Sequence, residues 1–244
     1  MSAILQFFPE RLDVNGDAQN ALVLAQRARW AGLDVELVAV SPGDRVPSER
    51  PAVIVVGSSV DSELVALRAD LADFSAALHD WVAAGVPLLA VGTGFEVLSH
   101  GIQFGDAADP DEFLEGLGIF PGRALPLPSR AVGDLVVDVR EGRLVGFENH
   151  ARGFSAHVDA PTLGAVVIGM GNDTRAEGSR IGSAIGTHLH GPVLAKNPSL
   201  ADAILNAAFG EHARPDSGEA MRVDGYAFAA RAAILAKLDL PAER

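Results

Sequence analysis

The 244-residue sequence contains no cysteine, and this absence removes several classes of site at once. Disulfide bonds, zinc–thiolate centres and cysteine nucleophiles all need a thiol, so none of them is available to this chain. The seven histidines show no HExxH or comparable metal-ligand spacing. We therefore expect neither a metal nor another cofactor.

Basic side chains are scarce: 19 Lys and Arg stand against 32 Asp and Glu, which gives a formal net charge of −13. Binding to nucleic-acid backbones or to anionic lipid surfaces depends on clustered Lys and Arg, so the balance argues against both partners. No segment reaches the roughly 18 apolar residues of a membrane helix. Residues 1–13 also lack the basic and apolar regions of a signal peptide. The sequence therefore predicts a cytoplasmic location without membrane insertion.

The first third of the chain alternates apolar runs with stretches of helical spacing. Ala52–Val56 and Leu88–Val91 are uninterrupted apolar runs, as in strands buried on both faces of a parallel sheet. Helical spacing covers Asp17–Ala31 and then Ser62–Ala84, as one helix or two. Further strands are expected at Ala3–Phe8 and Val35–Val40. The alternation predicts an α/β fold with a doubly wound, mostly parallel sheet flanked by helices.

The second half of the chain has a different pattern. Turn residues separate strand-like segments there, which predicts antiparallel additions in this half. These segments are Gly133–Val139, Leu144–Glu148 and Ala165–Ile168, followed by a further strand at Ile185–Leu189 and helices at Leu200–Phe209 and Gly225–Leu238. Because no repeat, low-complexity tract or linker interrupts the sequence, we expect one domain over residues 1–244.

Two loops are the first candidates for a functional site. In open α/β sheets, ligands bind at the carboxyl ends of the strands. Gly57–Asp61 follows one buried strand, and Gly92–Glu96 follows another. Both loops should therefore meet at one edge of the sheet.

A set of motifs in a fixed order carries a resemblance to a known family. The set consists of Asn15–Asn20 (NGDAQN), Gly57–Asp61 (GSSVD), Ala90–Leu98 (AVGTGFEVL), Gly146–His150 (GFENH) and Ile185–Pro198 (IGTHLHGPVLAKNP). It resembles the class I, triad-type glutamine amidotransferases, in particular their cobyric-acid-synthase-type branch. Within that branch, the chain is similar to the GatD-type glutaminase subunits of lipid II isoglutaminyl synthase.

The resemblance implies a glutaminase centre from which the nucleophile has been lost. In the family, a cysteine at a strand-to-helix elbow attacks the side-chain amide of glutamine, and a histidine transfers the protons. Gly92 occupies the position of that cysteine, and His190 matches the histidine. Hydrolysis should therefore be absent, with His190 vestigial. An acidic residue near Pro192, found in other class I enzymes, is missing here, as expected for this branch.

Other departures from the family pattern agree with lost hydrolysis. Ser58 and Ser59 replace two glycines of the loop whose backbone N–H groups would hold the oxyanion, and Thr93 follows the elbow. Glu96 replaces a glutamine and would place negative charge near that oxyanion. Arg130 matches an arginine that helps to hold glutamine, and a guanidinium can bind an α-carboxylate in two places.

Simpler interpretations of these residues stay open. Gly92 could be an ordinary turn glycine, His190 a structural histidine and Arg130 a surface arginine. Alternatively, a hydroxyl of Ser58, Ser59 or Thr93 could act as a nucleophile with His190.

The resemblance implies that the chain works with a MurT-like Mur ligase in amidation of the D-glutamate of lipid II during peptidoglycan synthesis. Without hydrolysis, the subunit would act as a scaffold or regulator of a ligase that uses free ammonia. The alternative is a binding module for glutamine, a related amino acid or a peptidoglycan fragment.

Overall fold

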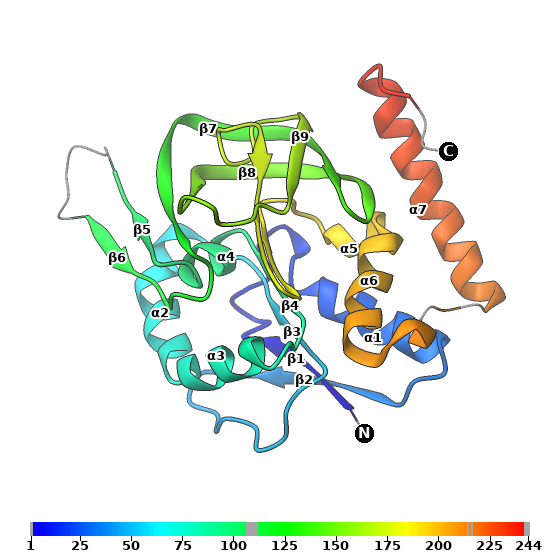
Figure 1. Cartoon of the computed structure of the whole chain (residues 1–244), viewed down its shortest axis with the longest axis horizontal. Coiled ribbons are helices and arrows are strands. Elements are labelled where there is room, and N and C mark those ends of the chain that lie inside the picture. Colours follow the sequence, from blue (N-terminus) through cyan, green and yellow to red (C-terminus); the bar gives the residue numbers. More distant parts are fainter. Residues whose placement is uncertain (1, 106–111, 214, 216, 242–244) are drawn as a thin grey trace.

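Two β-sheets organise the chain in the computed structural model, which describes residues 2–105, 112–213, 215 and 217–241 (Figure 1). The first sheet has the strand order β11-β12-β4-β3-β1-β2. Its strands are β1 (Ser2–Phe7), β2 (Val35–Val40), β3 (Val53–Val56), β4 (Leu88–Val91), β11 (Ser179–Ile181) and β12 (Ala184–Thr187). Every neighbouring pair is parallel except β11 and β12. The predicted mostly parallel sheet is therefore confirmed.

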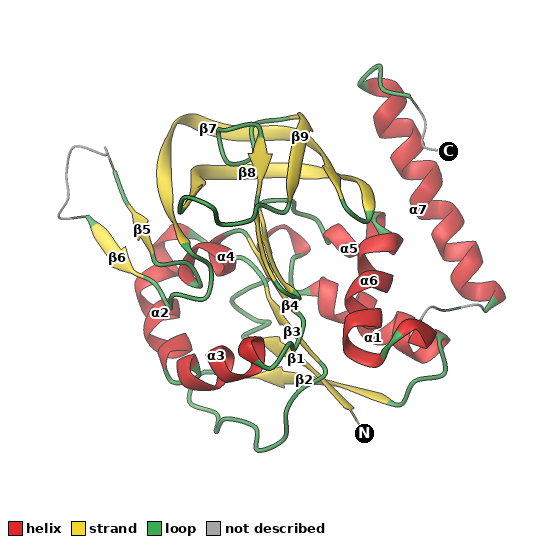
Figure 2. Cartoon of the chain, in the orientation of Figure 1, coloured by secondary structure: helices red, strands yellow, loops and turns green. Residues whose placement is uncertain are grey.

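Helices cover both faces of the first sheet (Figure 2). Those on one side are α2 (Leu64–Ala72) and α3 (Ser75–Ala83), and those on the other are α1 (Gln19–Trp30) and α6 (Pro198–Phe209). Two short helices lie near the carboxyl ends of the strands, α4 (Thr93–Val97) and α5 (Val193–Lys196). This is the doubly wound arrangement that the alternating sequence pattern predicts.

The uninterrupted apolar runs are explained by this two-sided cover. Along β3, Ile54 and Val56 pack into the cluster that contains α2 and α3. Val53 and Val55 pack into the cluster that contains α1 and α6. Because successive side chains of a strand point to opposite faces, a strand covered on both faces must be apolar at every position. Each such side chain contributes about 1.5–3 kcal/mol of burial free energy.

The second sheet has the order β10-β9-β7-β5-β6, and β8 pairs with β7. Its strands are β5 (Gly101–Gln103), β6 (Phe113–Glu115), β7 (Gly122–Val139), β8 (Gly142–Ala156), β9 (Gly164–Ile168) and β10 (Ala176–Glu177). All its pairs are antiparallel except that of β5 with β7. The antiparallel additions expected in the second half are thus present.

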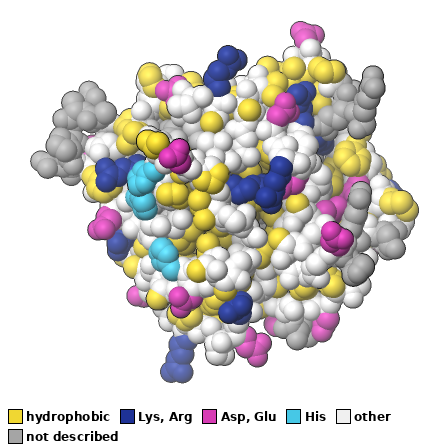
Figure 3. Space-filling view, in the orientation of Figure 1, with side chains coloured by type: hydrophobic (Ala, Val, Ile, Leu, Met, Phe, Trp, Pro, Cys, Tyr) yellow, Lys and Arg dark blue, Asp and Glu magenta, His cyan; other side chains and the backbone are white. Residues whose placement is uncertain are grey.

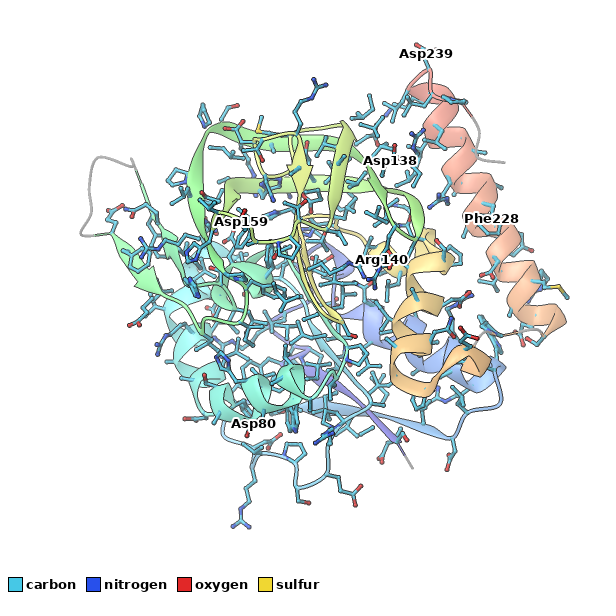
Figure 4. The ribbon with its side chains drawn as sticks, in the orientation of Figure 1. Asp80, Asp138, Arg140, Asp159, Phe228 and Asp239 are labelled. Atoms are coloured by element: carbon cyan, nitrogen blue, oxygen red, sulfur yellow. The ribbon has the colours of Figure 1, made fainter. Side chains whose placement is uncertain are left out.

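The hairpin of β7 and β8 is longer than the sequence predicts. Figure 4 labels Asp138 and Arg140 near the turn between the two strands. The prediction placed the start of β7 at Gly133, whereas the strand begins at Gly122. Pro126 and Pro128 lie in the part of β7 that was not predicted, and proline cannot donate to a β-ladder. The register shifts between Pro126 and Ala131, and this irregularity accommodates the prolines.

Helix α7 (Gly218–Lys237) begins seven residues before the predicted start at Gly225. The hydroxyl oxygen of Ser217 accepts the backbone N–H of Ala220 at 3.1 Å, which caps the helix and fixes its beginning. Near the other end, Leu235 packs against Val136 and Val145 of the second sheet. Phe228, labelled in Figure 4, is 53% exposed on the helix.

Candidate functional site

The sharp turn that leaves the central strand β4 forms the middle of the site. Gly92 follows Val91 directly and has φ +53° and ψ −125°, a conformation that favours glycine. Its N–H donates to the carbonyl of Thr187 at 2.9 Å, which ties the turn to the neighbouring strand β12. Helix α4 starts at the next residue. Gly92 therefore occupies a strand-to-helix elbow, as the family resemblance requires.

His190 lies opposite this elbow. A Cβ atom on residue 92 would lie 3.5 Å from Nε2 of His190, so the imidazole faces the position of a side chain there. The histidine is 2% exposed, and within the described part of the chain its Nε2 has no hydrogen-bond partner. The two residues are 98 positions apart in sequence, and β4 and the segment after β12 bring them together.

Asp17 holds the imidazole from behind and was not predicted as a site residue. Its Oδ2 lies 2.6 Å from Nδ1 of His190, and its Oδ1 accepts the N–H of Gly191 at 3.1 Å. Because a carboxylate can only accept, Nδ1 carries the proton and the lone pair of a neutral ring lies on Nε2. Asp17 is fully buried and stands in the motif Asn15–Asn20. That motif was the only sequence signal for it.

Side-chain hydroxyls form hydrogen bonds in the loop after β3. The backbone N–H of Ser59 donates to Oγ1 of Thr93 at 2.7 Å, and this hydroxyl in turn donates to the carbonyl of Ser59 at 3.2 Å. The Ser58 hydroxyl lies 2.5 Å from Oδ2 of Asp17 and 2.9 Å from the carbonyl of Val14. Since Nε2 of His190 has no partner in the described chain, the structure gives no support to a hydroxyl nucleophile at these positions.

Glu96 carries a buried negative charge that is balanced by Arg152. Nε of Arg152 donates to Oε2 of Glu96 at 2.8 Å, and the same guanidinium pairs with Asp61 at 2.7 Å. Burial raises the pKa of Glu96, but the charge of Arg152 and the nearby His188 outweigh it and hold the pKa at about 2. Glu96 is therefore ionised, and its charge is shared with a guanidinium. Arg152 was missed in the sequence, because nothing local to it indicates a partner 56 residues away.

Two buried histidines lie beside this ion pair. The rings of His150 and His188 are stacked, with centroids 4.2 Å apart. His150 lies 2.7 Å from the carbonyl of Arg152 through Nδ1 and 3.3 Å from Glu148 through Nε2. Burial opposes the charged form of His150, but the acceptor Glu148 outweighs it and raises the pKa. Burial lowers the pKa of His188, and the charge of His150 adds to the effect.

A cavity of about 310 Å³ opens above the elbow and brings the predicted residues together. Those that line it are Ser58, Ser59, Gly92, Thr93, Glu96, Arg130 and His190, which are all the site residues proposed from the sequence. Arg130 lies at the exposed margin, where its Nε donates to Oδ1 of Asn149 at 2.9 Å. The cavity is therefore polar and lies at the carboxyl end of the first sheet.

Two kinds of feature are absent from the described residues. No helix in this part of the chain is long and apolar enough to cross a membrane. Among the same residues, no group of three or more His, Asp or Glu side chains could hold a metal ion. On the face shown in Figure 3, Lys and Arg side chains lie scattered among acidic and apolar ones.

The fold and the elbow facing a buried His–Asp pair define a domain of the glutamine amidotransferase type. A solved glutamine amidotransferase from Thermotoga maritima has the same fold, with a TM-score of 0.54 and 12% identity over 93% of this chain and 90% of that one. Residues 13–198 match the CobB/CobQ-like glutamine amidotransferase domain, and the chain belongs to this family.

Two curated relatives carry the same name. The lipid II isoglutaminyl synthase (glutamine-hydrolyzing) subunit GatD of Staphylococcus aureus strain N315 is 30% identical over 84% of this chain and 83% of its own length. The subunit of that name from Streptococcus pneumoniae strain R6 is 27% identical over 84% and 79%, respectively. The predicted resemblance is therefore confirmed, and this family member has no cysteine.

Proposed function

We propose that the chain is a GatD-like subunit that has lost glutamine hydrolysis and acts as scaffold or regulator of a MurT-like Mur ligase. In this role it would serve amidation of the D-glutamate of lipid II, in the cytoplasm, during peptidoglycan synthesis. The similarity to two subunits named for lipid II isoglutaminyl synthase supports the pathway. The observation that carries the proposed loss is Gly92, which stands on the elbow and faces Nε2 of His190.

The chemistry of the proposed ancestor explains why this one residue decides the activity. A nucleophile on the elbow would attack the amide carbon of glutamine while the imidazole takes its proton and later gives one to the departing ammonia. Glycine has no atom that can form the covalent bond. Asp17 would still orient the imidazole, and His190 could still accept a proton. Residue 92, however, carries no nucleophile that could donate one.

The remaining site residues take the following proposed roles. His190 is the family base, now vestigial, and Gly92 marks the lost nucleophile. Ser58, Ser59 and Thr93 form the former oxyanion loop. Arg130 and Glu96 border the place of the substrate, although Glu96 is bound to Arg152 and so offers a shared charge rather than a free one.

Loss of hydrolysis changes the source of ammonia for the partner ligase. If the subunit releases no ammonia, the ligase must take ammonia from solution, and glutamine should not replace it. The chain would then contribute through its contact with the ligase rather than through its own reaction.

The complex provides the decisive experiment. The chain is co-expressed with the Mur-ligase-like protein from its own genome, and the purified complex is given lipid II and ATP with either glutamine or ammonium chloride. We expect co-purification, amidation with ammonium, and no amidation or glutamate release with glutamine. The GatD of S. aureus with its own ligase is the positive control. Glutamate release that disappears in His190→Ala would overturn the proposal.

A second function, a binding module, is favoured by the cavity itself. Its lining includes Nε2 of His190, which has no partner among the described residues, and the exposed Arg130, whose guanidinium suits the carboxylate of a small amino acid. Glutamine, glutamate or a peptidoglycan fragment that binds there should raise the melting temperature by mass action. A shift that is present in the wild type and absent in Arg130→Ala would support this function. No shift with any of the three would count against it.

A further inference from the structure

The space beside Gly92 is filled. A Cβ atom on residue 92 would lie 2.7 Å from Cε1 of His190 and 2.8 Å from Cβ of Ser58. Carbon atoms in close-packed interiors stand about 3.5–4.0 Å apart, so both neighbours would have to move. The imidazole is held by Asp17, and the Cβ of Ser58 is fixed to the backbone. The position that a side chain at residue 92 would occupy is therefore filled by His190 and Ser58.

Ser58 is anchored in this position by the same carboxylate that holds the imidazole. Its hydroxyl lies 2.5 Å from Oδ2 of Asp17, the atom that also accepts from Nδ1 of His190. Ser58 stands where the family has a glycine, which would leave the space open and Oδ2 of Asp17 bonded to His190 without the serine hydroxyl. The side chain therefore closes the former nucleophile position from one side and is held there by a charged acceptor.

Thr93 occupies a backbone donor of the loop after β3. The N–H of Ser59 belongs to the loop that would hold the oxyanion, and it already donates to Oγ1 of Thr93 at 2.7 Å. A backbone donor that is occupied by a fixed hydroxyl cannot stabilise the charge that develops on a substrate oxygen. Removing one such donor typically lowers the rate constant by about 10²–10³-fold.

We infer that Ser58 and Thr93 lock the former reaction centre in a closed state, so that a thiol returned to position 92 hydrolyses glutamine only when both side chains are also removed. The inference rests on the proposed function, in which residue 92 is the former nucleophile position. It assigns to Ser58 the exclusion of a side chain at 92 and to Thr93 the occupation of the oxyanion donor.

The chain offers a matched control for backbone strain. Gly182 has φ +57°, close to the +53° of Gly92, but a Cβ on it would meet no atom within 4 Å. Gly182→Cys therefore measures the cost of a side chain at a similar positive φ without a steric conflict, whereas Gly92→Cys adds the conflict with His190 and Ser58. Each substitution is made with Ser58 and with Ser58→Gly, and the unfolding midpoint in urea is measured.

The closed state predicts a coupling between positions 58 and 92. Gly92→Cys should increase the unfolding equilibrium constant at least tenfold more than Gly182→Cys does. In the Ser58→Gly background this excess should shrink, while the effect of Gly182→Cys should stay the same. Equal effects of both cysteine substitutions on the unfolding equilibrium constant, in both backgrounds, would overturn the role of Ser58. This outcome does not depend on the proposed function.

The absence of cysteine makes the second experiment clean, because the introduced thiol is the only one in the protein. Its rate of alkylation by iodoacetamide and the release of glutamate from glutamine are measured for Gly92→Cys alone, with Ser58→Gly, with Thr93→Gly and with both. In the restored reaction the sulfur bonds to the amide carbon and ammonia leaves with a proton from His190. Water then cleaves the thioester to glutamate and regenerates the thiol.

We expect alkylation to be at least tenfold faster once Ser58 is replaced, and glutamate release at an appreciable rate only in the triple variant. Thr93→Gly should raise that release about 100-fold over the variant that keeps Thr93. Release by Gly92→Cys alone at the rate of the triple variant would overturn the inference. So would a triple variant whose thiol is alkylated rapidly but which releases no glutamate. The proposed function fails by a different result, namely glutamate release by the wild-type chain.

Discussion

Two buried charged regions lie side by side at the carboxyl end of the first sheet, and they have different designs. In the first region, around Gly92 and His190, Asp17 fixes His190 and leaves Nε2 without a partner in the described structure. In the neighbouring cluster, Arg152 pairs with both Glu96 and Asp61. The first region places the unpartnered Nε2 of His190 at the cavity, whereas the second gives its buried carboxylate, Glu96, a guanidinium partner within the described chain. The difference teaches which buried polar groups a reaction needs and which ones the fold needs.

Loss of a nucleophile should thus leave the first region intact but without activity, while loss of a charge in the second should affect stability. A side chain whose role was chemical can be removed without an unpaired charge remaining. A side chain that neutralises a buried carboxylate cannot be removed in this way, because the carboxylate is then left dehydrated and without a counter-charge.

The largest expected effect comes from Arg152→Ala. It would leave Glu96, which is 1% exposed, without its guanidinium, and breaking a buried pair from one side costs about 3–5 kcal/mol. Urea unfolding of the purified chain measures the change. The matched control is the double variant Arg152→Met with Glu96→Gln, which removes both charges and should be less destabilised than Arg152→Ala. A double variant that is equally or more destabilised would show that packing, not charge, dominates.

Acid sensitivity provides the next test of the same cluster. The pKa of Glu96 is about 2 in the folded chain, below its ordinary value of about 4.5. A depressed pKa contributes stability that is present above the ordinary value and is lost as the pH falls toward 2. We expect the free energy of unfolding to decrease in this window with a slope of up to about 1.4 kcal/mol per pH unit from this group.

The control for the acid effect is Glu96→Gln, which has no proton to bind at this position. Its stability should change less steeply with pH between 4.5 and 2 than that of the wild type. Parallel pH profiles for the two proteins would mean that Glu96 is not the group that titrates.

A smaller effect on stability is expected in the region around Gly92 and His190. His190→Ala removes one charged hydrogen bond of Asp17, which keeps those from Ser58 and the N–H of Gly191, and should cost about 2 kcal/mol. Thermal or urea unfolding measures it against His157→Ala, an exposed histidine that should change stability by less than about 0.5 kcal/mol. A cost for His190→Ala as large as that of Arg152→Ala would erase the contrast between the regions.

Arg130→Ala should have the smallest effect on stability, within about 0.5 kcal/mol, because the side chain is exposed and its partner is Asn149. Its unfolding midpoint should match that of the wild type. A large loss of stability would show that Arg130 stabilises the fold and does not serve only the margin of the cavity.

The sequence predicted β1, β2, β3, β4 and β12 of the first sheet because their apolar signal is local, but it did not predict β11. Val53–Val56 and Leu88–Val91 are apolar at every position, as expected of strands covered on both faces. It predicted the ends of β7 and α7 poorly. The prolines near residue 127 and the glycine at 225 are unfavourable locally but are tolerated where tertiary contacts hold the element. The single-domain organisation over residues 1–244 stays a prediction.

The candidate site shows the same division. The sequence motifs predicted Gly92 and His190 as site residues, and both line the cavity. Asp17 also stands in a motif, but no role was predicted for it because its partner lies 173 residues away. Arg152 stands outside the motifs, and its charge partner lies on a different element. Pairings across the chain depend on where the strands place their ends, and sequence spacing does not reveal this.

By itself, the sequence determined the α/β class, the family and the absence of any thiol, because periodicity, motifs and composition are properties of the chain alone. Only the tertiary structure decided that Gly92 faces His190, that Asp17 orients the ring and that Ser58 and Thr93 fill the centre. These are distances between atoms that are far apart in the sequence, and they exist only after the two sheets and their helices have packed.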